Sequence, residues 1–252
     1  MADPHAQEPW RARFDWGPVG AAALAGTSEV VTVVDVLSFT TALTVAVDAG
    51  IEVFPFRWRD SRAERFAQEH NAVLAVGRSE AQPGRISLSP GSILAGGRVE
   101  RLVLPSPNGS TIAHDVAADG TPLIGVSLRN ATAAAEWTLR RLASVPGSSV
   151  SVIAAGERWP DGSLRPAVED LWGAGAYLAA LDARGFGPFS PEACTAAATY
   201  RAVAGELSAQ LRASASGREL IDLRFADDVE IAAEVDASTA VPVLQGESFL
   251  AA

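Results

Sequence analysis

The chain of 252 residues contains no lysine, so all 20 of its basic residues are arginine, and it has one cysteine and three histidines. A single cysteine allows neither an intramolecular disulfide nor a multi-cysteine zinc site. Cys194 stands in an alanine-rich stretch, which we expect to be a helix with the thiol buried. A Walker A phosphate-binding loop is excluded, because that loop requires a lysine.

Long apolar runs and positive charge are also scarce. No apolar run reaches the roughly 18 residues that a transmembrane helix needs, and residues 1–16 lack the pattern of a secretory signal. We therefore expect a cytoplasmic protein without a membrane partner. The formal net charge of −10 argues against a nucleic-acid partner, since phosphate backbones require basic patches. A local arginine cluster could still bind a small anionic substrate.

Short β-branched runs alternate with helical patterns from residue 30 onward. This alternation predicts a largely parallel sheet with helices on both faces. The predicted strands are 30–35, 51–55, 73–76, 101–104, 122–126 and 149–154. The predicted helices are 40–49, 60–70, 110–118, 130–143, 168–183, 190–213, 216–223 and 226–235. The last four make the C-terminal third rich in helix.

The predicted fold class is therefore α/β, a three-layer α/β/α arrangement with a mostly parallel or mixed central sheet. We expect residues 1–29 to be an N-terminal arm and lead-in, and residues 30–252 to be one domain. The apolar residues 241–244 could form an edge strand or a tail on the surface.

The segment with the strongest functional pattern is the end of the first predicted strand. Five valines lie within residues 30–36, and the strand ends at Asp35, followed by Thr40 and Thr41. The threonines could simply cap the next helix, or they could hold a phosphate while Asp35 binds a metal. We favour a functional Asp35, because a buried strand keeps a carboxylate only at a cost. Strand ends of this kind bind ligands in open α/β sheets.

Two later strands also end in turns that could bind an anion. After the strand at 101–104, the turn Asn108, Gly109 and Ser110 leads into a helix. Its backbone N–H groups could form an anion-binding nest, although Asn-Gly is also common in ordinary turns. The strand at 149–154 leads in the same way into Gly-Glu-Arg at 156–158.

Two adjacent acids, Glu169 and Asp170, occupy the first turn of a predicted helix. The helix dipole explains one acid at this position. A pair is more than the dipole requires, and Gly173 and Gly175 allow close backbone approach. Hard carboxylate oxygens suit Mg²⁺, so the pair is a candidate metal site.

Taken in order, these segments resemble the Mg²⁺-dependent 2-phosphosulfolactate phosphatases over roughly residues 30–244. The matching segments are DVLSFTT at 35–41, VGR at 76–78, SPNGS at 106–110, LRNATA at 128–133, AAGE at 154–157, EDLWGAG at 169–175, and the closing segments 216–236 and 241–244. This chain has Ser38 where the family has arginine, Phe39 at a normally small position, Gly77 where the family has glutamate, and Ser106-Pro107 where it has two threonines. Without the arginine at position 38, the site lacks one guanidinium group that could bind a carboxylate or sulfonate through two parallel hydrogen bonds.

The resemblance implies a Mg²⁺-dependent phosphatase that hydrolyses a small anionic phosphoester, 2-phosphosulfolactate or a related 2-phospho acid, and we expect a homodimer. The catalytic and metal-binding candidates are Asp35, Glu169 and Asp170. The candidates for binding phosphate and substrate are Thr40, Thr41, Arg78, Asn108, Gly109, Ser110, Arg129, Asn130, Gly156 and Arg158. The alternative is a non-catalytic protein that binds a small anion, which the replacements at Ser38 and Gly77 motivate.

Overall fold

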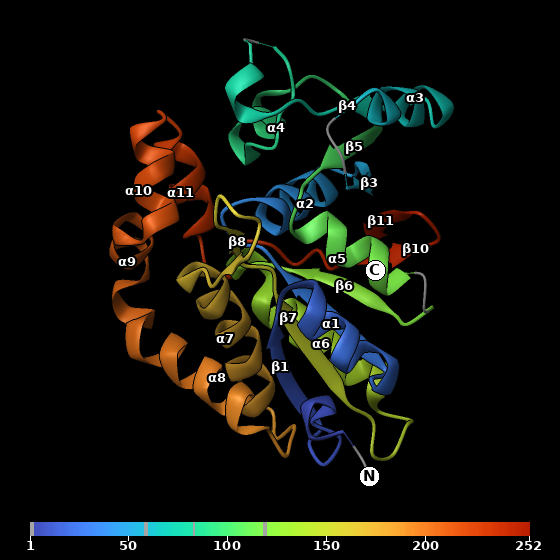
Figure 1. Cartoon of the computed structure of the whole chain (residues 1–252), viewed down its shortest axis with the longest axis vertical. Coiled ribbons are helices and arrows are strands. Elements are labelled where there is room, and N and C mark those ends of the chain that lie inside the picture. The colour runs from blue at the N-terminus through green and yellow to red at the C-terminus, as the bar shows by residue number, and fades with distance from the viewer. Residues whose placement is uncertain (1–2, 58–59, 83, 118–119) are drawn as a thin grey trace.

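The computed structural model describes residues 3–57, 60–82, 84–117 and 120–252. Its centre is a nine-stranded sheet in the order β1-β7-β2-β6-β10-β11-β3-β5-β4 (Figure 1). The strands are β1 (Ala12–Trp16), β2 (Val30–Val34), β3 (Glu52–Phe56), β4 (Val73–Leu74), β5 (Arg101–Pro105), β6 (Leu123–Val126), β7 (Val150–Ala154), β10 (Pro242–Gln245) and β11 (Ser248–Ala251). The α/β class with a mixed, mostly parallel sheet is thus confirmed.

The sheet consists of two parallel groups joined by an antiparallel hairpin. Strands β1, β7, β2 and β6 pair in parallel, and so do β3, β5 and β4. The hairpin of β10 and β11 pairs with β6 on one side and β3 on the other. The prediction of an edge strand or tail at 241–244 was therefore wrong. The sequence continues into β11, and the two strands together fill the gap between the groups.

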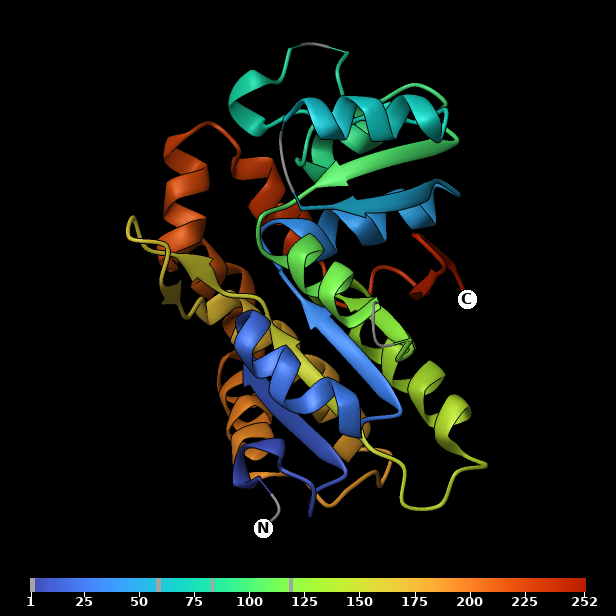
Figure 2. The same cartoon turned by 45° about the vertical axis from the view of Figure 1, so that its right-hand side comes forward.

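Helices cover both faces of the sheet (Figures 1 and 2). The valines of β2 alternate between the two faces of the sheet. Val30 and Val34 belong to the core cluster on one face, and Val31 and Val33 belong to the cluster on the other. The first cluster takes side chains from α6 (Ala131–Leu142), α7 (Val168–Asp182), α8 (Pro191–Val203), α9 (Leu207–Ala213), α10 (Ala215–Asp222) and α11 (Ala226–Ala232). The second takes them from α1 (Gly17–Leu24), α2 (Phe39–Asp48), α4 (Pro90–Ala95) and α5 (Gly109–Ala117). Helix α3 (Ser61–Glu69) packs on β4 and β5.

The N-terminal segment is more ordered than the expected arm. Residues 12–16 form β1, which pairs along its whole length with β7, and α1 follows at once. Phe14 is buried in the first core cluster, with Trp16 packed against it. The aromatic residues of this segment therefore complete the edge of the sheet, which the sequence pattern did not predict.

The remaining predicted elements are found within a few residues of their expected bounds, apart from the following differences. The helix predicted at 190–213 is divided by the short 3-10 helix η5 (Ala204–Glu206). Residue 118, the last of the helix predicted at 110–118, lies outside the described residues. A small hairpin of β8 (Glu157–Arg158) and β9 (Leu164–Arg165) was not predicted. Cys194 is exposed rather than buried, because α8 buries Ala193, Ala196 and Ala197 instead. Within the described ranges, every helix is too short or too polar to traverse a bilayer.

Candidate active site

Asp35 lies directly after β2, in a turn whose shape is set by two threonines. The hydroxyl of Thr40 accepts from the Asp35 N–H at 3.0 Å and donates to the Asp35 carbonyl at 2.9 Å. The hydroxyl of Thr41 donates to the Val36 carbonyl at 2.6 Å. Both threonines are buried. Their hydroxyl groups therefore bind the backbone of the turn and present the carboxylate of Asp35 beyond the strand end.

The Asp35 carboxylate contacts the start of α5. Its Oδ2 accepts the backbone N–H of Gly109 at 2.9 Å and the hydroxyl of Ser106 at 3.4 Å. A Cβ atom at position 109 would lie 2.6 Å from Phe39 Cδ1 and 2.8 Å from Asp35 Oδ2. These distances are too short for a side chain. Glycine at 109 is therefore what lets the start of α5 approach the acid.

Asp170, in the first turn of α7, lies beside the same turn. Its Oδ1 accepts the N–H of Val36 at 2.7 Å and its Oδ2 accepts the N–H of Gly156 at 2.8 Å. Helix α7 can come this close because residue 173 is a glycine, where a Cβ would lie 2.5 Å from Val36 Cγ2. Asp170 thus links the ends of β2 and β7, and the neighbouring Glu169 is buried as well.

The acids at this point are shielded from water and repel one another. Burial, followed by the charge of Glu157, raises the pKa of Asp35 to about 7, against an ordinary value of 3.8. Burial and the charges of Asp35 and Glu169 raise the pKa of Asp170 well above its usual range. Burial also raises the pKa of Glu157, with a smaller upward contribution from Glu169. Each acid is therefore easier to protonate than in water, as expected when carboxylates share a dry site.

A cavity of about 340 Å³ lies next to this acidic group. It is lined by Leu37, Ser38, Arg78, Leu88, Pro107, Asn108, Glu157, Arg158, Arg165, Ser216, Glu219, Leu220 and Leu223. Glu157 belongs both to the acidic group and to the cavity wall, because its charge acts on Asp35 and it lines the cavity. Asn108, also on the wall, donates through Nδ2 to Glu157 Oε2 at 2.9 Å. Three arginines on the wall supply guanidinium groups that could bind an anionic molecule, and two acids, Glu157 and Glu219, lie on the same wall.

Comparison with known proteins gives the family. A family profile described as 2-phosphosulpholactate phosphatase matches residues 21–247. The chain belongs to this family. A relative from Thermus thermophilus, named probable 2-phosphosulfolactate phosphatase, is 34% identical over 227 residues, covering 86% of this chain and 89% of the relative. One from Deinococcus radiodurans with the same name is 28% identical over 224 residues, covering 86% and 88%. The resemblance inferred from the sequence is thus confirmed, and the 2-phosphosulpholactate phosphatases are phosphoric monoester hydrolases.

The site residues that sequence analysis proposed lie in different positions relative to the cavity. Asp35, Glu169 and Asp170 are close together but do not line the cavity, whereas Arg78, Asn108 and Arg158 do. Three other candidates already have partners within the chain: the backbone N–H groups of Gly109 and Gly156 donate to the carboxylates of Asp35 and Asp170, and the hydroxyl of Ser110 donates to the Leu104 carbonyl.

Arg129 and Asn130 lie outside the cavity. The Arg129 guanidinium donates to the Ile231 carbonyl at 3.1 Å and pairs with Glu234, so it holds the end of α11. The Asn130 side chain accepts from the Ser127 N–H at 2.9 Å and also donates to carbonyls at both Gly125 and Ala240. In the structure the side chains of both residues bind neighbouring segments of the chain, and neither residue lines the cavity.

Sequence reasoning did not select several residues of the cavity wall. Glu157 follows Gly156 directly, so its place at a strand end was a usable signal. Arg165 donates to the Ser216 hydroxyl at 3.1 Å, and Glu219 lies one helical turn after that serine on α10. No local pattern indicated Arg165 or Glu219, because they come together only when α10 packs beside the β8–β9 hairpin.

The donor atoms at the site suit Mg²⁺, although no cage is already formed. Among the described residues, no three histidine, cysteine or acidic side chains are arranged to enclose a metal ion. Mg²⁺ does not need such an arrangement, because it keeps several waters and uses one or two carboxylates. Asp35, Glu169 and Asp170 supply hard oxygen donors, and a divalent cation would offset the burial and the mutual repulsion that raise the pKa values of Asp35 and Asp170. The residues therefore fit the ion.

Proposed function

We propose that this protein is a Mg²⁺-dependent phosphatase that hydrolyses 2-phosphosulfolactate or a related small 2-phospho acid to the 2-hydroxy acid and phosphate. The observation that carries the proposal is the contact between the Asp35 turn and Asp170, beside a cavity lined with arginines. Family membership supplies the reaction class, and the names of the two relatives support the substrate.

Asp35, Glu169 and Asp170 would hold the cation. Each Asp170 oxygen accepts one backbone N–H and retains a second lone pair for a ligand. Bound Mg²⁺ supplies charge neutralisation at the phosphoryl oxygens. In the net reaction an oxygen from water bonds to phosphorus, the bond from phosphorus to the C2 oxygen breaks, and that oxygen gains a proton.

The cavity wall would bind the organic part of the substrate. Arg158 and Arg165, on the two strands of the β8–β9 hairpin, line one cavity together with Arg78. Guanidinium binds carboxylate and sulfonate groups through paired hydrogen bonds. Asn108 holds Glu157 at the wall by its 2.9 Å hydrogen bond, and Glu157 lies opposite Arg165 in the β8–β9 pair.

Phosphate release in a single turnover with excess enzyme tests the proposal. The full chain with Mg²⁺ should release phosphate from 2-phosphosulfolactate, and EDTA should stop the release. A panel of 2-phospho acids with and without a sulfonate then ranks the substrates by kcat/KM. The proposal fails if the Mg²⁺-loaded protein releases no phosphate from any member of the panel.

A non-catalytic anion-binding protein is the second candidate. It is favoured by one observation: the N–H groups of Gly109 and Gly156, which could bind a phosphate, already bind Asp35 and Asp170. Such a protein would be stabilised against heat by the phosphoester and would release no phosphate. The same single-turnover experiment therefore separates the two candidates.

The cytoplasmic location and the homodimer stay predictions. The net charge of −10 supports a small-molecule substrate over nucleic acid. Light scattering coupled to size-exclusion chromatography would measure the molar mass in solution, and a mass near twice 26.2 kDa would support the dimer.

A further inference from the structure

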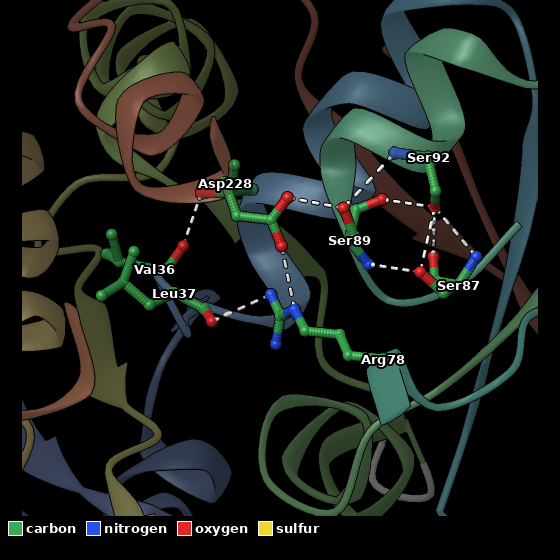
Figure 3. A network of polar contacts seen from close by, with 8 residues as sticks. Val36, Leu37, Arg78, Ser87, Ser89, Ser92 and Asp228 are labelled. Carbon is green, nitrogen blue, oxygen red and sulfur yellow. Dashed lines mark hydrogen bonds and ion pairs between the residues drawn. The ribbon is translucent and has the colours of Figure 1, made fainter. Parts of the chain in front are cut away.

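Asp228 on α11 is a buried acid with two side-chain partners (Figure 3). Only 4% of its side chain is exposed. Its Oδ2 accepts Arg78 Nε at 2.9 Å, and its Oδ1 accepts the Ser89 hydroxyl at 2.5 Å. Both oxygens of this carboxylate are therefore fixed, one by each partner.

Arg78 is held along one edge and presents the other to the cavity. Its side chain is 16% exposed, and its Nη2 donates to the Leu37 carbonyl at 3.2 Å. Figure 3 shows the third nitrogen, Nη1, without a contact to the residues drawn. Because Nε and Nη2 are both bound, the guanidinium plane cannot turn, and the direction of Nη1 is set. Arg78 lines the same cavity as Ser38 and Asn108.

The support for Asp228 continues into the loop after Arg78. The Ser89 hydroxyl that binds Asp228 also accepts the Ser92 N–H at 3.3 Å, and the Ser87 hydroxyl accepts the Ser89 N–H at 3.2 Å. The Ser92 hydroxyl in turn accepts the Ser87 N–H at 2.9 Å. These bonds order the loop, so Asp228 is held by Arg78 at one oxygen and by this loop at the other (Figure 3).

A buried ion pair of this kind contributes little net stability, because removing both charges from water offsets their attraction. Its effect is orientation: a guanidinium with two bound nitrogens loses less freedom when a ligand arrives. The partners are 150 residues apart in sequence, so the pair also joins α11 to the short 3-10 helix η3 (Arg78–Glu80).

We propose that Asp228 is a positioning residue, which fixes Arg78 so that its free Nη1 binds the carboxylate or sulfonate of the substrate. The inference rests on the proposed function, since it assigns a role in the same cavity. Asp228 does not line the cavity and acts only through Arg78. Its removal should therefore weaken substrate binding while leaving the chemical step largely intact.

A double-mutant cycle in the full-length, Mg²⁺-loaded protein tests this role. Asp228→Asn keeps the shape of the side chain and removes its charge. We expect it to raise KM by about tenfold with little change in kcat, as for loss of a ground-state contact. In the Arg78→Ala background the same substitution should have no further effect on kcat/KM, because the group it orients is already absent.

The matched control is Asp227→Asn, which makes the same change on the exposed neighbour of Asp228 in α11 and should leave KM and kcat unchanged. Circular dichroism checks that each variant folds. If Asp228→Asn does not fold, Ser89→Ala removes the bond to the other oxygen. It should raise KM by a smaller factor, again only when Arg78 is present.

Three results would overturn the proposal: an unchanged KM in Asp228→Asn, an equal loss in the Arg78→Ala background, or the same loss in the Asp227→Asn control. If the wild-type protein releases no phosphate, the proposed function fails by itself. The cycle is then measured on the Kd of sulfolactate by calorimetry. Coupling between positions 78 and 228 in that Kd would support the positioning role, and additive effects would reject it.

Discussion

The carboxylate of Asp170 accepts the backbone N–H of Val36 at 2.7 Å, and this bond joins the first turn of α7 to the turn that begins at Asp35. The other Asp170 oxygen binds the N–H of Gly156 at 2.8 Å. Two strand ends and one helix start are therefore tied together by a single side chain. This gives Asp170 a structural role as well as its charge.

Replacing Asp170 should accordingly destabilise the fold. In Asp170→Ala, two buried N–H groups lose their acceptor, and each unsatisfied group costs about 1–3 kcal/mol. We expect urea denaturation to show a free energy of unfolding lower by about 2–4 kcal/mol. Asp182→Ala, at the exposed far end of the same helix, should change it by less than about 1 kcal/mol. An Asp170→Ala protein as stable as wild type would show that the bonds to the Val36 and Gly156 N–H groups contribute nothing to the free energy of unfolding.

Replacing Asp35 should act on turnover instead. Asp35→Asn keeps an oxygen that can accept from the Gly109 N–H, but it removes the charge beside the proposed metal. We expect kcat to fall at least about a hundredfold, while the thermal midpoint stays within a few degrees of wild type. Asp222→Asn, an exposed aspartate of α10, serves as the control. Full activity in Asp35→Asn would remove Asp35 from the catalytic group.

Adding one methyl group at position 109 should disturb the site. The Cβ of Gly109→Ala would lie within 3 Å of both Phe39 and Asp35, so the start of α5 or the acid must move. Overpacking of this kind costs about 1–3 kcal/mol, and we expect kcat/KM to fall by more than about tenfold, as for a misplaced catalytic group. Gly205→Ala, which has open space around its Cβ, should be close to neutral. Comparable activity in the two variants would contradict the packing argument.

Stability without metal should depend on pH in a direction set by Asp35. Its folded-state pKa of about 7 lies above the ordinary value of 3.8, so the folded protein binds the proton more tightly than the unfolded chain. The resulting stabilisation is complete below pH about 4 and is lost as pH rises through about 7. In EDTA, the free energy of unfolding should therefore fall between these values.

Urea denaturation at several pH values measures this slope. Asp35→Asn should flatten it, since the titrating group is gone, and Mg²⁺ should stabilise the wild-type protein more at pH 8 than at pH 4. Mg²⁺ binds the ionised acids, which explains the second expectation. A wild-type protein whose stability in EDTA rises from pH 4 to pH 7 would contradict the burial of an unpaired carboxylate at this position.

Local sequence patterns were sufficient for most strands and helices from residue 30 onward. The valines of β2, the strand ends at Asp35 and Gly156, and the first turn of α7 at Glu169 and Asp170 were each visible as short-range patterns. The pattern failed for β1 and for β10. Their position depends on distant strands: β1 needs β7 as a partner, and β10 needs β6 and β11.

The same limit applied to the arginines. Sequence analysis assigned both Arg78 and Arg129 to the substrate, and both contact α11 or the residues just after it; Arg78 lines the cavity as well, whereas Arg129 does not. An arginine pattern shows that a guanidinium is present and says nothing about which distant carboxylate or carbonyl it meets. The C-terminal helices bring those partners, more than 100 residues along the chain in each case.

The sequence alone determined the fold class, the family and the existence of an acidic group at strand ends, because hydrophobic periodicity and short motifs are local properties of the chain. Only the tertiary structure decided how those groups are used. It placed Asp35 and Asp170 on the N–H groups of Gly109 and Gly156, and it placed Asp228 behind Arg78. Such pairings arise when burial removes water and each buried polar group must take the partner that packing brings within reach.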